Sequence, residues 1–402
     1  MTGGWSVKAL GDLFEISRGG SPRPIQDFLT EDVNGVNWIM ISDASASGKY
    51  IERTAKRIRP EGVARSRRVS PGDFLLTNSM SFGRPYIMKT EGCIHDGWLH
   101  LKKRDKSIDE EYFYHLLGSE ATYSKFERLA AGATVKNLNI DLVSSVKVPV
   151  PPLLEQRRIA TILDKADNLH RKRQEAIRLA NDFLTAVFSD MFGDPDSNPK
   201  GFEIGTIRDL VASANYGTSE KASEEVGRYA ILRMNNITYQ GGWDFSSLKY
   251  VDLEPATAHK YLTQRGDLLF NRTNSKELVG KTAVYMRDEP MAIAGYLVRV
   301  RMNERGNPHY VSGYLNSVHG KRSLEARAKS IVGMANINAQ EMQDIPLLLP
   351  PIQLQVKYAR IVEAVNARLE THQAFLRDAV ALQSALSHKF FGPVGAGEPE
   401  IC

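Results

Sequence analysis

The chain has 402 residues, of which 42% are hydrophobic and 25% charged, with a formal net charge of +5 and a pI near 9.0. These proportions are typical of a soluble globular protein with two or three domains. No run approaches the roughly 18–20 apolar residues of a membrane helix, and Met1–Trp5 opens no secretory signal. Two cysteines, Cys93 and Cys402, exclude a disulfide framework and favour the cytoplasm. The basic balance suits a polyanionic partner without requiring one.

Residues 5–150 are predicted to form a mixed α/β domain. Its strands are indicated by short runs rich in β-branched and aromatic residues and bounded by turn residues. These runs are Val36–Ser42, Asp73–Thr77, Tyr86–Met88 and Val143–Val150. A helix is predicted at Asp109–Glu127, where acidic residues precede an apolar stripe.

The hydrophobic period changes after Pro151-Pro152. A 3-4-3-4 spacing, typical of a coiled-coil seam, joins Ile159, Ile162, Ala166, Leu169, Arg173, Ala176, Ala180, Leu184, Val187 and Met191. The 38 residues Leu154–Met191 would form a helix of about 57 Å, too long for a core element, and therefore a spacer. The alternative is an ordinary amphipathic helix packed on its own domain. Residues 194–200 are predicted to be an exposed linker.

The second half of the chain gives the same order of elements. Strands are predicted at Tyr229–Met234, Gly266–Phe270, Thr282–Met286 and Tyr296–Arg301, and a helix near Pro308–Ala328. A noisier seam follows at Tyr358, Ile361, Val365, Arg368, His372, Phe375, Ala379, Gln383, Leu386 and Phe390.

An internal duplication underlies this order. Residues 137–193 match 336–392 without a gap at an offset of 199, which places Pro151-Pro152 on Pro350-Pro351 and Gln156 on Gln355. Further towards the N-terminus the match is looser, with Pro71–Leu76 on Arg265–Phe270 at an offset of 194. The duplication predicts domains at 1–150 and 201–349, helices at 151–193 and 350–392, and a tail at 393–402. The duplication therefore indicates two variable domains that have diverged while their helical scaffold stayed nearly constant.

The run Val148–Ala160 resembles the segment that opens the conserved helices of type I restriction-modification specificity subunits. Met191–Pro195 resembles the end of the first such helix, whereas the second copy has Leu354 in place of the expected glutamate. The resemblance covers the whole chain. It implies an α+β fold with two mixed α/β target-recognition domains joined by two long antiparallel coiled-coil helices, as a pseudo-two-fold internal repeat.

The resemblance also implies a function and partners. Each domain would read one half of an interrupted double-stranded DNA target. The paired helices would dock two methyltransferase subunits, which carry S-adenosylmethionine and methylate adenine, and nuclease-translocase subunits would join them. This chain would be non-catalytic, cytoplasmic and free of membrane contact. The alternative is a coiled-coil scaffold with two protein-binding domains and no role in DNA binding.

The sequence motifs agree with a chain that has no catalytic activity of its own. An adenine methyltransferase needs an Asn/Asp-Pro-Pro-aromatic loop, but Val150 and Leu349 precede the two proline pairs. Gly280-Lys281-Thr282 lacks the earlier glycine of a phosphate-binding loop. Cys93, His95 and His100 do not have zinc spacing. We therefore expect no catalytic residue, metal site or cofactor in this chain.

Loops rich in cations and amides are the candidate DNA contacts, since Lys and Arg bind phosphates and Arg, Asn and Gln read base edges. The candidates are Arg18, Arg23, Asn78, Ser81, Arg84 and Lys136 in the first half, and Arg233, Asn235, Arg272, Asn274 and Lys276 in the second. Loops 78–84 and 271–276 follow equivalent strands, so the duplication nominates both. Exposed loops carry such residues in any case. The cluster Arg65, Arg67 and Arg68 either faces phosphates or is simply solvated.

Candidate helix-pairing and partner-docking residues are Ile162, Leu169, Arg173, Ile361, His372 and Phe375. Arg173 and His372 occupy equivalent seam positions at the helix midpoints. In an antiparallel pair they would meet, so we expect a neutral His372 and an Arg173 that reaches water or a carboxylate.

Overall fold

The structure is a computed structural model that describes residues 5–78, 82–130, 137–331 and 334–392, with backbone only at 329–331. The chain divides into two compact units. Unit 1 comprises Met1–Arg173 and Phe375–Cys402, and unit 2 comprises Gln174–Ala374. Each unit therefore contains one of the repeated domains and about half of each long helix, and each is described by itself.

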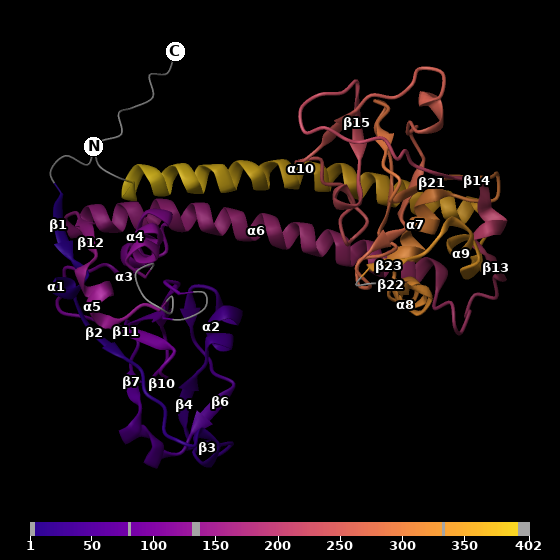
Figure 1. Ribbon diagram of the computed structural model, residues 1–402. Helices are drawn as coiled ribbons and strands as arrows, with labels where there is room; N and C mark the ends of the chain where they lie inside the picture. The colour runs from indigo at the N-terminus through magenta and orange to yellow at the C-terminus, as the bar shows by residue number, and fades with distance from the viewer. Residues whose placement is uncertain (1–4, 79–81, 131–136, 332–333, 393–402) are drawn as a thin grey trace. The chain divides into compact units, whose positions relative to one another are not determined.

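Two five-stranded sheets form the domain of unit 1 (Figure 1). The first has the order β2 (Phe14–Arg18), β11 (Trp98–Lys103), β8 (Phe74–Thr77), β9 (Pro85–Met88) and β5 (Tyr50–Ile51). The second, called here the distal sheet, has the order β3 (Leu29–Thr30), β6 (Lys56–Ile58), β4 (Val36–Ile39), β10 (Gly92–Ile94) and β7 (Arg67–Val69). Strands β1 (Ser6–Ala9) and β12 (Lys147–Val150) pair antiparallel, which brings the two ends of the domain together.

The helices of unit 1 correct three of the predicted boundaries. The predicted helix 109–127 is two helices, α3 (Glu110–Leu117) and α4 (Glu120–Ala130), because the chain turns at Gly118-Ser119. The end of the predicted strand 36–42 belongs to α2 (Ile41–Ser47), which Asp43 caps through the Met40 amide at 2.9 Å. The start of the predicted strand 143–150 belongs to α5 (Ile140–Ser145), capped by Asn139. Capping residues thus override the β-branched runs. Helix α1 covers Leu10–Leu13, and short 3-10 helices cover Ile25–Asp27 and Pro60–Arg65.

Unit 2 repeats the plan with smaller sheets. One has the order β14 (Val211–Tyr216), β21 (Leu297–Met302), β17 (Leu268–Asn271) and β19 (Thr282–Val284). The others are β16 (Lys249–Val251), β15 (Tyr229–Leu232) and β20 (Ala292–Ile293); β18 (Thr273–Asn274), β23 (Met334–Asn336) and β22 (Lys329–Ile331); and β13 (Glu203–Thr206) with β24 (Pro346–Leu349). The predicted helix 308–328 is again two helices, α7 (Pro308–Asn316) and α8 (Val318–Arg327), separated by Ser317, which caps α8. Helix α9 covers Ala339–Gln343, and 3-10 helices cover Ile207–Leu210, Met234–Asn236 and Ala258–Lys260.

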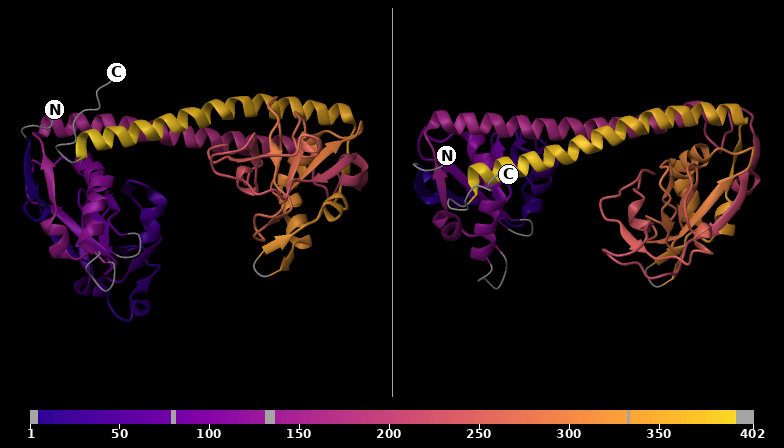
Figure 2. Two further views of the ribbon diagram at one scale, coloured as in Figure 1. Left: turned by 45° about the horizontal axis from the view of Figure 1, so that its top comes forward. Right: turned by 90° about the horizontal axis from the view of Figure 1, so that it is seen from above.

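The two long helices are α6 (Leu153–Phe192) and α10 (Ile352–Phe391). Within unit 1, the first part of α6 and the last part of α10 lie side by side (Figures 1 and 2). Asp167 accepts a hydrogen bond from Gln383, and Arg173 lies over the Phe375 ring at 4.7 Å. As residue numbers rise along α6 they fall along α10, so the two segments in unit 1 run antiparallel.

Burial along α6 departs from the predicted seam both near the middle of the helix and at its ends. Leu163 and Phe188 lie outside that seam and are buried, whereas Leu169 on the seam is 42% exposed. The ends are different because each packs on a domain as well as on the other helix. Leu163 joins the hydrophobic core of the unit 1 domain, and Phe188 joins that of unit 2.

The residues that recur in the duplication hold the same contacts in both units. Gln156 is buried, accepts a hydrogen bond from the Asp109 amide at 2.9 Å and donates to the carbonyls of Ser107 and Pro151. Gln355 accepts from the Asn307 amide at 2.9 Å and donates to the carbonyls of Arg305 and Pro350. Each glutamine thus fixes the start of a long helix to the start of a domain helix.

Candidate nucleic-acid interface

Four segments meet at one edge of the unit 1 domain, called here the loop edge of unit 1 (Arg18–Ser21, Asn78, His95–Gly97 and Leu138). The Gly19 amide donates to the Trp98 carbonyl at 3.0 Å, and the Gly20 amide to the Ile94 carbonyl at 3.1 Å. Asn78 donates its amide to the Gly97 carbonyl at 3.2 Å and accepts at its own carbonyl from the Leu138 amide at 3.0 Å. A Cβ on Gly19 would lie 2.0 Å from the His95 carbonyl oxygen, so only glycine permits this approach.

Asp96 is the polar centre of this edge. Its carbonyl accepts from the Arg18 Nε at 3.1 Å and from the Asn78 Nδ2 at 2.8 Å. Its carboxylate accepts from the Ser21 hydroxyl at 2.7 Å, and Arg23 lies 3.8 Å away with a largely exposed side chain. The Ser21 hydrogen bond is the main reason that the pKa of Asp96 is lowered. The carboxylate is therefore charged at neutral pH. Three sequence-predicted residues converge on Asp96, with Arg18 and Asn78 at its backbone carbonyl and Arg23 near its carboxylate.

The loop edge of unit 2 (Tyr216–Thr218, Arg272, Ala294–Tyr296 and Ile337) has the same backbone hydrogen bonds. The Gly217 amide donates to the Leu297 carbonyl at 3.1 Å. Arg272 donates its amide to the Tyr296 carbonyl at 3.0 Å and accepts at its own carbonyl from the Ile337 amide at 2.9 Å. Asn78 and Arg272 therefore occupy the same backbone position in the two units.

The side chains on these matching positions differ. On the neighbouring strand, Arg18 pairs with Leu99 and Tyr216 pairs with Val298, which makes Tyr216 the counterpart of Arg18. The Arg272 guanidinium lies over the Tyr216 ring at 4.7 Å. Gly295 stands where unit 1 has Asp96. Unit 1 thus presents an Asn–Arg–Asp group and unit 2 a guanidinium on an aromatic ring, an arrangement that holds the planar fork in one orientation.

The remaining sequence-predicted candidates are spread over the two domains. Arg84 is exposed and lies 5.5 Å from the Tyr86 ring centre, Arg233 donates to the Ser247 carbonyl at 2.8 Å, and Asn235 is exposed. Asn274 accepts from the Ser275 amide at 2.9 Å, and Lys276 lies 4.0 Å from Glu325. Ser81 and Lys136 lie outside the described residues.

Sequence reasoning missed Asp96, Ser21 and Tyr216. Their roles depend on contacts between residues far apart in the sequence, such as Ser21 with Asp96 and Tyr216 with Arg272. A usable signal did exist, because Gly19 and Gly217 stand at matching places after the first strand of each domain's main sheet.

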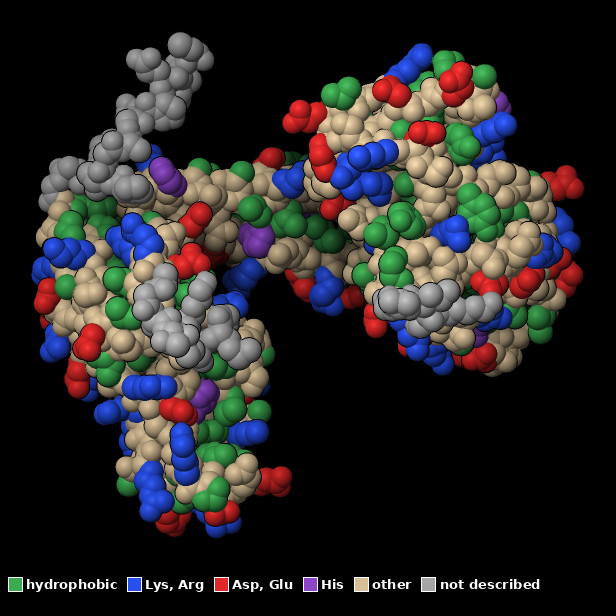
Figure 3. Space-filling view, in the orientation of Figure 1, with side chains coloured by type: hydrophobic (Ala, Val, Ile, Leu, Met, Phe, Trp, Pro, Cys, Tyr) green, Lys and Arg blue, Asp and Glu red, His purple; other side chains and the backbone are tan. Residues whose placement is uncertain are grey.

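Basic side chains also cover the distal sheet of unit 1. Arg67 and Arg68 are exposed on its edge strand β7, and Lys56 is exposed on β6. In the space-filling view, Lys and Arg side chains are spread over the lobe that contains this sheet (Figure 3). This surface is electrostatically suited to a polyanion.

The candidate helix residues line the long helices at different depths. Ile162 packs against the unit 1 core, and Ile361 and His372 are half-buried. Arg173 contacts the ring of Phe375, itself 48% exposed. Among the described residues, no group of three or more His, Cys, Asp or Glu could hold a metal ion, and no helix is long and apolar enough to cross a membrane.

Comparison with known proteins agrees with this repeated plan. The family model "Type I restriction modification DNA specificity domain" matches residues 2–179 and again 199–376. The chain is 21% identical to the EcoKI specificity subunit of Escherichia coli K12 and 20% identical to the StySPI specificity subunit of Salmonella potsdam, each over 98% of this chain and 89% of the relative. A crystal structure of a type I S subunit from M. genitalium has the same fold, with a TM-score of 0.62 at 16% identity, over 97% of this chain and 96% of that one. The chain belongs to the type I restriction-modification specificity subunits.

Proposed function

We propose that the chain reads a two-part, interrupted DNA sequence, with the domain of unit 1 on one half-site and the domain of unit 2 on the other. Recognition of DNA sequence is the role that its family implies. The main support for recognition of a two-part DNA sequence is that the loop edge is repeated in both units. The backbone hydrogen bonds at Asn78 and Arg272 are the same, whereas the side chains are different. The same backbone arrangement thus positions both loop edges, while the side chains available to contact DNA differ between the units.

The loop edges suggest how each half-site is read. Arg272 is held on the Tyr216 ring. Its guanidinium could donate two hydrogen bonds, which guanine O6 and N7 would accept in the major groove. In unit 1, Arg18 and Asn78 are held by the Asp96 carbonyl, so a base edge or phosphate would compete with that contact. Arg67, Arg68 and Lys56 on the distal sheet would add contacts to phosphates.

The long helices are proposed to set the spacing between half-sites. Helices α6 and α10 have 40 residues each, about 60 Å at 1.5 Å per residue. Their antiparallel contact inside unit 1 supports a continuous coiled coil that relates the two halves by a pseudo-two-fold axis. On this proposal the domains are 1–150 and 201–349, the spacer helices are 151–193 and 350–392, and the linker and tail are 194–200 and 393–402.

The chain is proposed to be a non-catalytic subunit. It would position two adenine methyltransferase subunits, which carry the S-adenosylmethionine, and nuclease-translocase subunits on the DNA in the cytoplasm. A coiled-coil scaffold with two protein-binding domains is the competing function. A gel shift made with the methyltransferase present separates the two, because only a DNA reader gives a salt-dependent shift.

Replacement of residues 5–150 by the matching domain of a relative tests the two-part reading. The modified DNA motif of the hybrid, determined by methylation profiling, should change in one half-site and keep the other. A change in both half-sites would contradict independent readers.

A further inference from the structure

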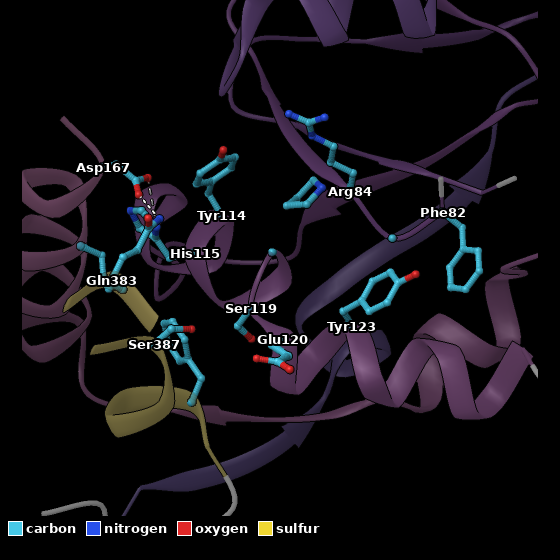
Figure 4. Close-up of a pocket in the computed structure, with 15 residues that line it drawn as sticks. Phe82, Arg84, Tyr114, His115, Ser119, Glu120, Tyr123, Asp167, Gln383 and Ser387 are labelled. Atoms are coloured by element: carbon cyan, nitrogen blue, oxygen red, sulfur yellow. Dashed lines mark hydrogen bonds and ion pairs between the residues drawn. The ribbon is translucent and has the colours of Figure 1, made fainter. Parts of the chain in front are cut away.

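A cavity of about 560 Å³ lies in unit 1 between the domain and the two long helices (Figure 4). His115 of α3 lies at its wall, with Nε2 2.8 Å from Asp164 and Nδ1 3.8 Å from Asp167. Asp167 also accepts a hydrogen bond from Gln383 of α10 (Figure 4). These four side chains therefore have their partners within unit 1.

The two units are built differently at this place. In unit 2 the ring of Phe188 lies beside Gly313, where a Cβ would lie 2.8 Å from the ring. His115 stands in unit 1 where unit 2 has Gly313, and Ser387 stands where unit 2 has Phe188. Unit 1 thus has an imidazole where unit 2 leaves room for a ring.

The carboxylate of Asp96 has a different environment, because it stands at the loop edge of unit 1 and its side chain is 47% exposed. The Ser21 hydroxyl donates to its Oδ1 at 2.7 Å, whereas Oδ2 lies 3.8 Å from Arg23, too far for a hydrogen bond. The Arg23 side chain is itself 83% exposed, and an ion pair of that kind contributes little to stability. Oδ2 can therefore accept a hydrogen bond from a molecule outside the chain.

The backbone of the loop edge does not need this carboxylate. Unit 2 has a glycine, Gly295, at the same position. In unit 1 the Gly20 amide donates to the Ile94 carbonyl at 3.1 Å. In unit 2 the Thr218 amide donates to the Ile293 carbonyl at 2.8 Å, which is the matching hydrogen bond. Since the turn forms without the carboxylate in unit 2, the carboxylate in unit 1 is free to serve recognition.

Arg18 supplies hydrogen-bond donors beside this carboxylate. Its Nε donates to the Asp96 carbonyl at 3.1 Å, so the guanidinium is fixed to the residue that bears the carboxylate. Arg18 is exposed, and its two terminal nitrogens make no hydrogen bond to another described residue. In the major groove, a G·C pair presents the O6 and N7 acceptors of guanine beside the N4 amino donor of cytosine. An arginine donor next to a carboxylate acceptor matches that pattern.

We propose that Asp96 determines specificity in unit 1 by accepting a hydrogen bond from the N4 amino group of a cytosine. The inference rests on the proposed function, because it names the base that the loop edge of unit 1 reads. An ionised carboxylate accepts but cannot donate, so Asp96 rejects thymine and guanine, which present a carbonyl oxygen in the major groove. The neighbouring Arg18 and Arg23 reduce the repulsion between this carboxylate and the DNA phosphates.

The first test compares the methylation profiles of cells in which the wild-type chain, Asp96→Ala or Asp96→Asn is assembled with its partner subunits. The wild-type motif should contain a G·C pair in the half-site of unit 1, and Asp96→Ala should no longer require it. Asp96→Asn should move the preference at that position toward adenine, since asparagine binds adenine N6 and N7. The other half-site should stay unchanged in both variants.

Asp105→Ala is the matched control for this test. Asp105 also accepts a hydrogen bond from a serine hydroxyl, that of Ser107, but it lies beyond the opposite end of β11. This variant should keep the wild-type motif. A half-site of unit 1 without a G·C pair, or a motif that stays the same in Asp96→Ala, would overturn the inference.

The second test removes the amino group from the DNA instead of the carboxylate from the protein. The full chain is assembled with its methyltransferase subunit, and its affinity for oligonucleotides is measured by fluorescence anisotropy. Replacement of the cytosine by pyrimidin-2-one, which lacks the amino group, should weaken binding by the wild type at least about tenfold. The same replacement should change binding by Asp96→Ala less than about twofold.

Equal losses for the wild type and Asp96→Ala would mean that the carboxylate and the amino group do not interact, and would overturn this inference alone. A wild-type complex without salt-dependent binding to any oligonucleotide would overturn the proposed function as well. The two failures are thus distinguished in one experiment.

Discussion

The two units share one arrangement of elements but differ in some of the side chains that it carries. They agree in the hydrogen bonds that hold each long helix to its domain, and they differ at the loop edges. Gln156 and Gln355 make identical sets of hydrogen bonds. Buried carboxylates also recur, with Asp73 2.9 Å from His100 and Asp267 3.8 Å from Arg299. At the loop edges, by contrast, Asn78 stands where unit 2 has Arg272. The comparison teaches that the repeat preserves the hydrogen bonds that hold the fold together and varies the side chains at the loop edges, which are proposed to contact DNA.

The largest expected effect concerns the ring that only unit 2 contains. Phe188→Ala should lower the stability of unit 2 by about 3–5 kcal/mol, because it removes a buried ring from an aromatic cluster. Ser387→Ala in unit 1 should change stability by less than about 0.5 kcal/mol. Hydrogen exchange of the amides in β17 and β21 measures the first, and that of β8 and β11 the second. Equal losses in the two units would mean that the cores are built alike.

The shared glutamines should behave as a matched pair. Gln156→Ala and Gln355→Ala should each cost about 2–3 kcal/mol, since each leaves a buried amide and two carbonyls without their partner. Denaturant unfolding followed by hydrogen exchange in each unit gives both values. A large loss of stability in one unit with almost none in the other would show that the two glutamines do not have equivalent structural roles.

Tyr216→Leu tests the ring beneath Arg272. Loss of the cation–π contact should weaken binding to cognate DNA by about 0.5–2 kcal/mol, with discrimination reduced in one half-site only. Fluorescence anisotropy with oligonucleotides altered in either half-site measures this effect. Tyr216 is uncharged, so the salt slope of binding should stay constant, and a changed slope would indicate a lost phosphate contact instead.

The smallest expected effect is the response of unit 1 to acid. Burial raises the pKa of Asp164, but hydrogen bonds from His115 and Lys49 outweigh it, so the folded pKa is lowered. The pKa of Asp73 is lowered in the same way, where the His100 hydrogen bond outweighs burial. A depressed folded pKa gives stability that is present above the unfolded pKa of about 3.9 and is lost as pH falls through the folded pKa. Unfolding measured from pH 6 to pH 2 should show this loss in unit 1, and Asp164→Asn should reduce it.

Much of the fold could be predicted because the duplication and the hydrophobic period are local signals. The start and end of the first long helix were predicted to within one residue, with Leu154–Met191 against Leu153–Phe192 in the structure. The second was predicted at 350–392 and covers Ile352–Phe391. The helix 109–127 was predicted as one because its apolar stripe continues through Gly118-Ser119, where the turn is decided by the Ser119 hydroxyl. Burial of Leu163 could not be read from the seam, since it depends on the domain packed beside the helix.

The candidate site was predicted only as a set of loops. Loops 78–84 and 271–276 were nominated because they follow equivalent strands, and Asn78 and Arg272 do share one backbone position. The partners that orient these residues come from other segments, Asp96 from the turn between β10 and β11 and Tyr216 from the end of β14. Their pairing depends on strand register, which composition and spacing do not contain.

The most direct test of the two-reader account is a parallel methylation profile of Asn78→Ala and Arg272→Ala. Each variant is assembled with its partner subunits in cells, and the modified motifs are read across the genome. The account predicts that Arg272→Ala relaxes one base position in one half-site, at a cost of about 1–3 kcal/mol, and that Asn78→Ala alters only the other half-site. If both variants changed the same half-site, or if Arg272→Ala weakened all sequences alike, the two loop edges would not be separate readers.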